Sequence, residues 1–183
     1  FVDLREGVFK SLSWSPGGRF LAAEAEGDVW WIYRRDTATL VLTSVVTSSV
    51  GTAWISDSEL VFAPVDGGLR LMNLDQANAQ VELLDASVIY RLPELDSNAA
   101  LVFFGRDPND PTVPDGYGRL LRLARGAQQV ETVGQVPVAL NGLRWAPGGS
   151  LLVAFQGAVL ALYDPSTGLG FPLPMTDVVA YDW

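Results

Sequence analysis

Short apolar segments alternate with polar turns along the whole chain, and none of them shows the spacing of a helix face. In the first group the turns contain Pro-Gly-Gly, Glu-Gly and Arg-Arg-Asp, which favour reversal of the chain. Apolar segments of this length between such turns are typical of β-strands. We predict strands at residues 10–14, 19–25, 29–33 and 39–45.

Three further groups follow the same plan. We predict strands at 52–55, 59–63, 69–74 and 79–84 in the second group, 88–92, 99–104, 119–123 and 128–133 in the third, and 142–145, 151–155, 159–163 and 170–173 in the fourth. Most connections are short enough for hairpins, so each group is expected to form an antiparallel meander. The predicted fold class is therefore all-β, with about four units of four antiparallel strands.

A tryptophan-containing phrase ends the first predicted strand and returns along the chain. Trp-Ser-Pro-Gly-Gly at 14–18 returns as Trp-Ala-Pro-Gly-Gly at 145–149, with a degenerate copy at Trp54, 40 residues after Trp14. Leu95 takes the equivalent place in the third group, 41 residues after Trp54. The positions that define this repeat are Trp14, Pro16, Gly17, Trp54, Trp145, Pro147, Gly148 and Trp183. A period near 40 residues with four strands per unit is the signature of β-propeller blades.

The repeat places the blades at about 8–47, 48–86, 87–135 and 136–175, and residues 176–183 have the pattern of the first strand of a further blade. We expect the repeated tryptophan to fill the space between neighbouring blades, and Pro-Gly-Gly to form the tight turn after it. Trp30 and Trp31 project to opposite faces of one strand, where packing on both sides is favoured over sugar stacking.

The phrase at 14–23 together with Asp-Val-Trp-Trp-Ile-Tyr at 28–33 resembles the TolB-type, WD-like β-propeller repeat. The Gly-His pair of the true WD repeat is absent, and Trp-Asp does not close the third strands. The resemblance covers residues 8–183 and implies a radial scaffold, a shape that serves many functions. A ring of this family usually has more than four blades, so we expect an incomplete ring. Open blade edges and apolar faces then predict self-association.

Composition excludes several kinds of chemistry. The chain has no Cys and no His, which removes disulfides, thiol nucleophiles, Cys-ligated metals and the commonest general base. Twelve basic and 21 acidic residues give a net charge of −9, which argues against nucleic-acid binding. No apolar run has the length of a transmembrane helix. We predict no cofactor and no metal.

One departure from the repeat marks the candidate site. Leu95 and Trp145 are 50 residues apart, and the excess lies at 107–116, between the second and third strands of the third group. Its candidate ligand-binding residues are Asp107, Asn109, Asp110, Asp115 and Tyr117. The acidic side chains could approach Ca²⁺, but the glycine and terminal glutamate of an EF-hand loop are missing, so a plain surface insertion is the favoured reading.

Three functions remain open. The first is a non-catalytic scaffold for a protein or small-molecule partner, in a bacterial extracytoplasmic protein. The second is the gating propeller of a larger hydrolase such as a prolyl-oligopeptidase-type peptidase, whose catalytic residues would lie elsewhere because no Gly-x-Ser-x-Gly sequence is present. The third is a glycosidase or lyase that uses carboxylates on innermost strands. Its candidates are Glu94, Asp96, Asp177 and Asp182.

Overall fold

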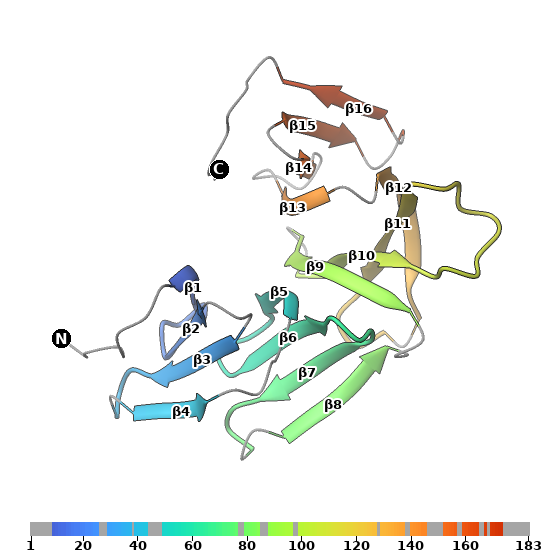
Figure 1. The fold of residues 1–183 in the computed structure, drawn as a ribbon. Coiled ribbons are helices and arrows are strands. Elements are labelled where there is room, and N and C mark those ends of the chain that lie inside the picture. The colour runs from blue at the N-terminus through green and yellow to red at the C-terminus, as the bar shows by residue number, and fades with distance from the viewer. Residues whose placement is uncertain are drawn as a thin grey trace. The chain divides into compact units, whose positions relative to one another are not determined.

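A computed structural model of the chain describes residues 9–25, 29–37, 39–43, 49–76, 79–84, 88–96, 99–127, 129–137, 140–145, 152–156, 159–164, 167 and 169–173. The chain divides into two compact units, Phe1–Ala86 and Ser87–Trp183. Every regular element in the described residues is a β-strand, as predicted (Figure 1). None of these residues belongs to a helix long and apolar enough to cross a membrane.

The first unit contains two four-stranded antiparallel sheets in which neighbours in sequence are neighbours in space. The first sheet consists of β1 (Phe9–Trp14), β2 (Phe20–Ala25), β3 (Val29–Arg34) and β4 (Thr39–Thr43). The second consists of β5 (Ser49–Trp54), β6 (Glu59–Pro64), β7 (Leu69–Asn73) and β8 (Ala79–Leu84). Short turns make this order possible; Gly18, for example, takes a φ of 67° in the turn before β2.

The second unit repeats the plan. The third sheet consists of β9 (Ile89–Leu95), β10 (Leu101–Arg106), β11 (Tyr117–Leu123) and β12 (Glu131–Pro137). The fourth consists of β13 (Leu140–Trp145), β14 (Leu152–Gln156), β15 (Val159–Asp164) and β16 (Leu169–Pro172). All sixteen strands in the described residues overlap the predicted segments.

The largest shift is at β12, which was predicted at 128–133 and runs from Glu131 to Pro137. A turn occupies the preceding residues, where the Ala127 N–H donates to the Ala124 carbonyl at 2.9 Å. Gly126 takes a φ of 77° within this turn. Because of this turn, β12 starts at Glu131 and not at residue 128, where the sequence pattern places its start.

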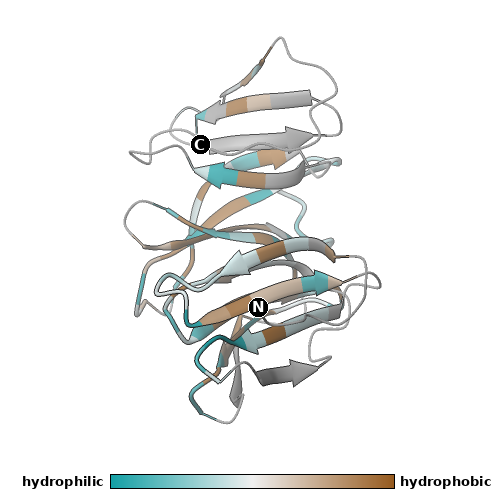
Figure 2. Cartoon of the chain, turned by 90° about the vertical axis from the view of Figure 1, so that its left-hand side faces the viewer, coloured by the Kyte–Doolittle hydropathy of each residue, from teal (hydrophilic) through white to brown (hydrophobic). Residues whose placement is uncertain are grey.

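The first unit buries its apolar residues between its two sheets. Phe20, Ala22, Trp30 and Ile32 of the first sheet form one cluster with Trp54, Leu60, Phe62, Met72 and Leu74. Figure 2 shows hydrophobic positions along the strands with hydrophilic positions between them, as half-buried strands require. Trp30 is thus a packing residue, as the sequence favoured.

The repeated tryptophan does not have the same surroundings in every sheet. Trp54 stacks on Phe20 with centroids 6.3 Å apart, and its indole N–H donates to the Ser13 carbonyl at 3.2 Å. In the second unit, Trp145 packs against a cluster that includes Phe104. The expected role is confirmed for these two residues and is wrong for Trp14, which is 53% exposed. Leu12, two residues earlier on the same face of β1, is 59% exposed as well.

The register supports the equivalence drawn from the sequence. Trp54 pairs with Leu60, and Leu95 pairs with Leu101, so both residues end the first strand of their sheet. Pro147, Gly148 and Trp183, and the strand predicted at 176–183, lie outside the described residues.

Candidate functional site

The longest described connection within a sheet runs from residue 107 to residue 116 and joins β10 to β11 (Figure 1). Its turns are made by its own aspartates. The Asp107 carboxylate accepts the Asn109 N–H at 2.8 Å, and the Asp110 carboxylate accepts the Thr112 N–H at 2.9 Å. Aspartate forms such turns readily, and prolines at 108, 111 and 114 restrict the backbone further. The loop is therefore a folded segment, which we call the 107–116 loop.

Arg119 of β11 fastens the 107–116 loop to the sheet. Its Nε and Nη2 donate to Oδ2 of Asp110 at 3.1 and 2.7 Å. Nη2 also lies 2.7 Å from Thr112 Oγ1, whose hydroxyl donates to Asp110 Oδ1 at 2.6 Å. The Thr112 hydroxyl, and then Arg119, lower the pKa of Asp110 from 3.8 to about 2. Asp110 is thus a charged anchor at neutral pH, and its oxygens are engaged within the protein.

A cavity of about 200 Å³ lies between the 107–116 loop and the third sheet. Asp107, Asp110, Asp115 and Tyr117 line it, whereas Asn109 is exposed on the loop away from the cavity. The structure therefore brings four of the five predicted site residues together. Ligand pockets are usually about 300–1,000 Å³, so this cavity suits a single side chain better than a metabolite.

Two glycines of β10 and β11 lie close to neighbouring side chains, and one of them, Gly105, lines this cavity. A Cβ on Gly105 would lie 2.5 Å from the Leu121 side chain, and one on Gly118 would lie 2.2 Å from the Phe104 ring. Either contact would force neighbouring side chains apart, because real Cβ atoms do not approach so closely. The strands beneath the loop therefore have little tolerance for larger residues.

The acidic residues of the loop do not form a cation site. The described residues contain no group of three or more His, Cys, Asp or Glu side chains placed to hold a metal ion. The carboxylates of Asp107 and Asp110 serve the turns and Arg119 instead. The geometry gives no support to the calcium alternative.

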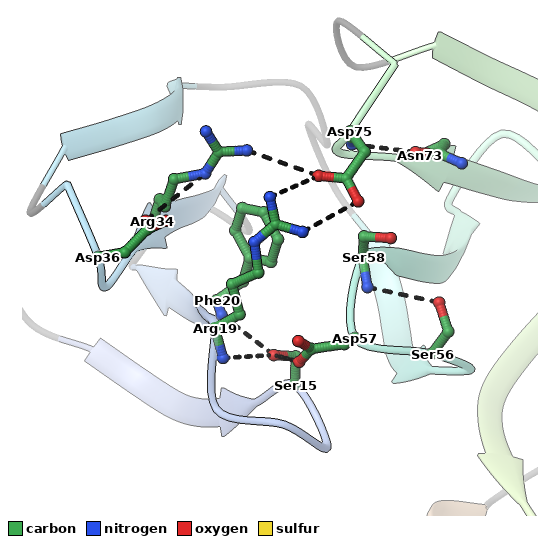
Figure 3. A network of polar contacts seen from close by, with 10 residues as sticks. All are labelled: Ser15, Arg19, Phe20, Arg34, Asp36, Ser56, Asp57, Ser58, Asn73 and Asp75. Atoms are coloured by element: carbon green, nitrogen blue, oxygen red, sulfur yellow. Dashed lines mark hydrogen bonds and ion pairs between the residues drawn. The ribbon is translucent and has the colours of Figure 1, made fainter.

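A second polar network links the two sheets of the first unit (Figure 3). Ser15, which is 2% exposed, donates to Asp57 at 2.5 Å and accepts the N–H groups of Arg19 and Phe20 at 3.1 and 3.0 Å. The Gly17 N–H donates to the same Asp57 oxygen at 3.0 Å. The Ser15 hydroxyl, foremost among several donors, lowers the pKa of Asp57.

Arg19 extends this network to Asp75 through contacts of 3.0 and 2.8 Å (Figure 3). The hydrogen bond from Arg19, followed by one from Ser58, lowers the pKa of Asp75. Because the Ser15 hydroxyl is buried, accepts two backbone N–H groups and donates to Asp57, all of its hydrogen-bonding capacity is used within the protein, and we assign this network to structure. The sequence marks the position of Asp57, because this residue follows Trp54 in the degenerate copy of the repeat. The sequence does not indicate its partner, Ser15, which lies 42 residues away.

The carboxylates proposed for a glycosidase are each paired with an arginine where the structure describes them. Asp96 accepts Arg122 Nε and the Ala100 N–H, both at 2.9 Å, and Glu94 forms an ion pair with Arg144. The hydrogen bond to Asp96 is the main cause of a raised pKa of Arg122. Asp177 and Asp182 lie outside the described residues. The described pair gives no support to carboxylate catalysis.

No family model matches the sequence, and no curated protein matches it. Among solved structures, a chain of the crystal structure of the mitotic checkpoint complex matches 90% of this chain at 17% identity and a TM-score of 0.60. The C-terminal WD40 domain of Sif2 matches 92% of it at 12% identity and a TM-score of 0.64. This chain spans 50% and 46% of those two chains.

Both neighbours are WD40 β-propeller domains, and at these identities the likeness concerns the fold. The fold is therefore that of a partial β-propeller, and its four-stranded sheets are blades.

Proposed function

We propose that this chain is a non-catalytic propeller scaffold that binds a protein partner through the 107–116 loop. The observation that carries the proposal is the attachment of this loop to β11 by Arg119 and Asp110. A surface loop that is already ordered loses little conformational entropy when a partner binds. The loop exposes Asp107 and Asp115, and Tyr117, the first residue of β11, is 43% exposed beside it.

The size of the cavity beneath the loop favours a protein over a small molecule. A volume of about 200 Å³ accommodates one anchoring side chain of a partner. Tyrosine and arginine are the residues most often found at the energetic centre of protein interfaces, and both are present around this cavity. One structural neighbour comes from the mitotic checkpoint complex, an assembly, which is in keeping with a binding role.

We further propose that the scaffold is of the TolB-type and belongs to a bacterial extracytoplasmic protein. The Trp-Ser-Pro-Gly-Gly repeat supports this placement through its resemblance to that family. Fractionation of the cells that make the full-length protein tests it, because recovery with the cytoplasmic fraction would overturn it.

Site-specific photo-crosslinking in those cells tests the binding role. A photoreactive phenylalanine at Tyr117 should give a discrete cross-linked product. The same residue at Val65 is the control, because Val65 is 57% exposed and lies in the equivalent connection of the second sheet. Arg119→Gln should remove the product at 117 by freeing the loop.

Equal products at both positions, or a product unaffected by Arg119→Gln, would overturn the proposal. Mass spectrometry of the product also addresses the alternative function. A cross-link to a hydrolase domain of the same polypeptide would favour a gating role over a partner-binding one.

A further inference from the structure

A second cavity, of about 240 Å³, is lined by residues of β9, β10 and the start of the 107–116 loop. Its described lining is Ile89, Arg91, Phe104, Arg106 and Pro108. Phe104 also belongs to the cluster that packs against Leu143 of the fourth sheet. The cavity is therefore on the face of the third sheet that is turned toward the fourth.

Two arginines with no carboxylate partner share this cavity. Neither Arg91 nor Arg106 has a side-chain ion pair or hydrogen bond with another described residue, and Arg91 Nε is buried without an acceptor. The other partly buried arginines described in this unit, Arg119 and Arg122, face carboxylates, as does the exposed Arg144. A buried guanidinium N–H without an acceptor is destabilising, so its place here needs a reason.

A β-bulge brings these two arginines to the same face. Arg91 pairs with Phe104 and Ile89 with Arg106, but the register shifts between Val102 and Phe104. Without that shift Arg91 would project from the opposite face, because successive residues of a strand alternate. Leu92 at the bulge takes a φ of 52°, which is strained for a leucine. The bulge in β9 therefore places Arg91 diagonally beside Arg106 on one face of the sheet.

We propose that Arg91 and Arg106 form a binding site for an oxyanion, either a phosphate or a carboxylate. Guanidinium groups bind both through paired N–H donors, and the apolar Phe104 wall strengthens such contacts by excluding water. In a chain with 21 acidic and 12 basic residues, two adjacent arginines that pair with no described carboxylate leave their guanidinium groups available to an external anion. Arg106 and Pro108 also line the cavity beneath the 107–116 loop, so the two cavities adjoin, but neither proposal depends on the other.

Calorimetric titration tests the site with two probes, inorganic phosphate and a blocked diglutamate peptide, at constant ionic strength. The wild-type chain should bind at least one probe. Arg91→Gln and Arg106→Gln should each weaken that binding about tenfold or more, as expected from loss of a charged hydrogen bond. Arg125→Gln is the matched control, since it removes one charge from an exposed arginine in the β11–β12 turn.

The two probes distinguish the source of the anion. Binding of phosphate alone indicates a free phosphate ligand, and binding of the peptide indicates an acidic side chain of a partner. Removing a guanidinium whose Nε is buried without an acceptor should also leave the melting temperature of Arg91→Gln equal to or above that of the wild type. No binding of either probe to the wild type, or unchanged binding by the Arg91→Gln and Arg106→Gln variants, would overturn the proposal.

Discussion

The indole of Trp54 stacks on the ring of Phe20 across two neighbouring sheets, with centroids 6.3 Å apart and planes inclined by 18°. This contact lies in a fully buried cluster and is supplemented by the hydrogen bond from Trp54 to Ser13. The repeated tryptophan is therefore a connector between blades wherever a neighbouring blade is packed against it.

Replacement of Trp54 by alanine should lower the free energy of unfolding by about 3–5 kcal/mol, the usual cost of removing a large buried aromatic side chain. Trp14→Ala is the matched control at the same repeat position. Because Trp14 is 53% exposed, its loss should cost less than about 1 kcal/mol. Urea denaturation measures both, and equal losses would contradict the packing difference.

The Ser15 hydroxyl should matter more to stability than its small size suggests. Ser15→Ala leaves the Arg19 and Phe20 N–H groups without their acceptor and removes a donor from Asp57. A loss of about 1–3 kcal/mol in the free energy of unfolding is expected for such buried groups. Ser56→Ala is the control, because Ser56 is less buried and its hydroxyl donates to Glu59. A Ser15→Ala chain as stable as the control would contradict the assignment.

The anchor of the 107–116 loop should respond to acid. The pKa of Asp110 is lowered from 3.8 to about 2, so its stabilising contacts are fully present above pH 3.8 and are lost as the pH falls through about 2. Carboxyl-carbon NMR titration should give this low pKa in the wild type. Thr112→Val should raise it, since the Thr112 hydroxyl is the largest cause of the shift.

Asp75 serves as the internal reference in the same titration. The pKa of Asp75 is lowered chiefly by Arg19, and both residues lie in the first unit, whereas Thr112 lies in the second. The pKa of Asp75 should therefore not change in the Thr112→Val variant. A parallel change in both residues would indicate general unfolding instead of a local effect on the loop.

Strand positions were predictable because glycine, proline and aspartate mark the turns between apolar segments. The loop was predictable from the spacing of Leu95 and Trp145 alone. Its anchoring by Arg119 was not, because that pairing depends on how the loop folds back over β11. The sequence also gave no sign that Trp14 and Trp54, at the same repeat position, would differ in exposure.

The arginine cavity was equally hidden from the sequence. Alternation along a regular strand would separate Arg91 from Arg106, and only the bulge at Leu92 brings them to one face. Leucine has no preference for a positive φ, so the bulge at Leu92 cannot be predicted from the type of residue at that position. Spatial proximity across strands, more than residue identity, defines both candidate sites.

Exchange of the 107–116 loop separates the two proposed sites. The replacement is Val-Asp-Gly-Gly, residues 65–68, which makes the equivalent connection between β6 and β7. Since the strand pairing of the hairpin is not altered, the blade should still fold. Arg119→Gln in the same chain avoids leaving that arginine without its Asp110 partner.

The cross-linked product at Tyr117 should be lost, because the loop surface and its cavity are gone. Anion binding should persist, because Arg91 and Arg106 belong to β9 and β10 and the exchange removes only Pro108 from the described lining of their cavity. Calorimetry and cross-linking on one preparation measure both effects, and loss of both functions in a chain with an unchanged melting temperature would show that the two sites are one.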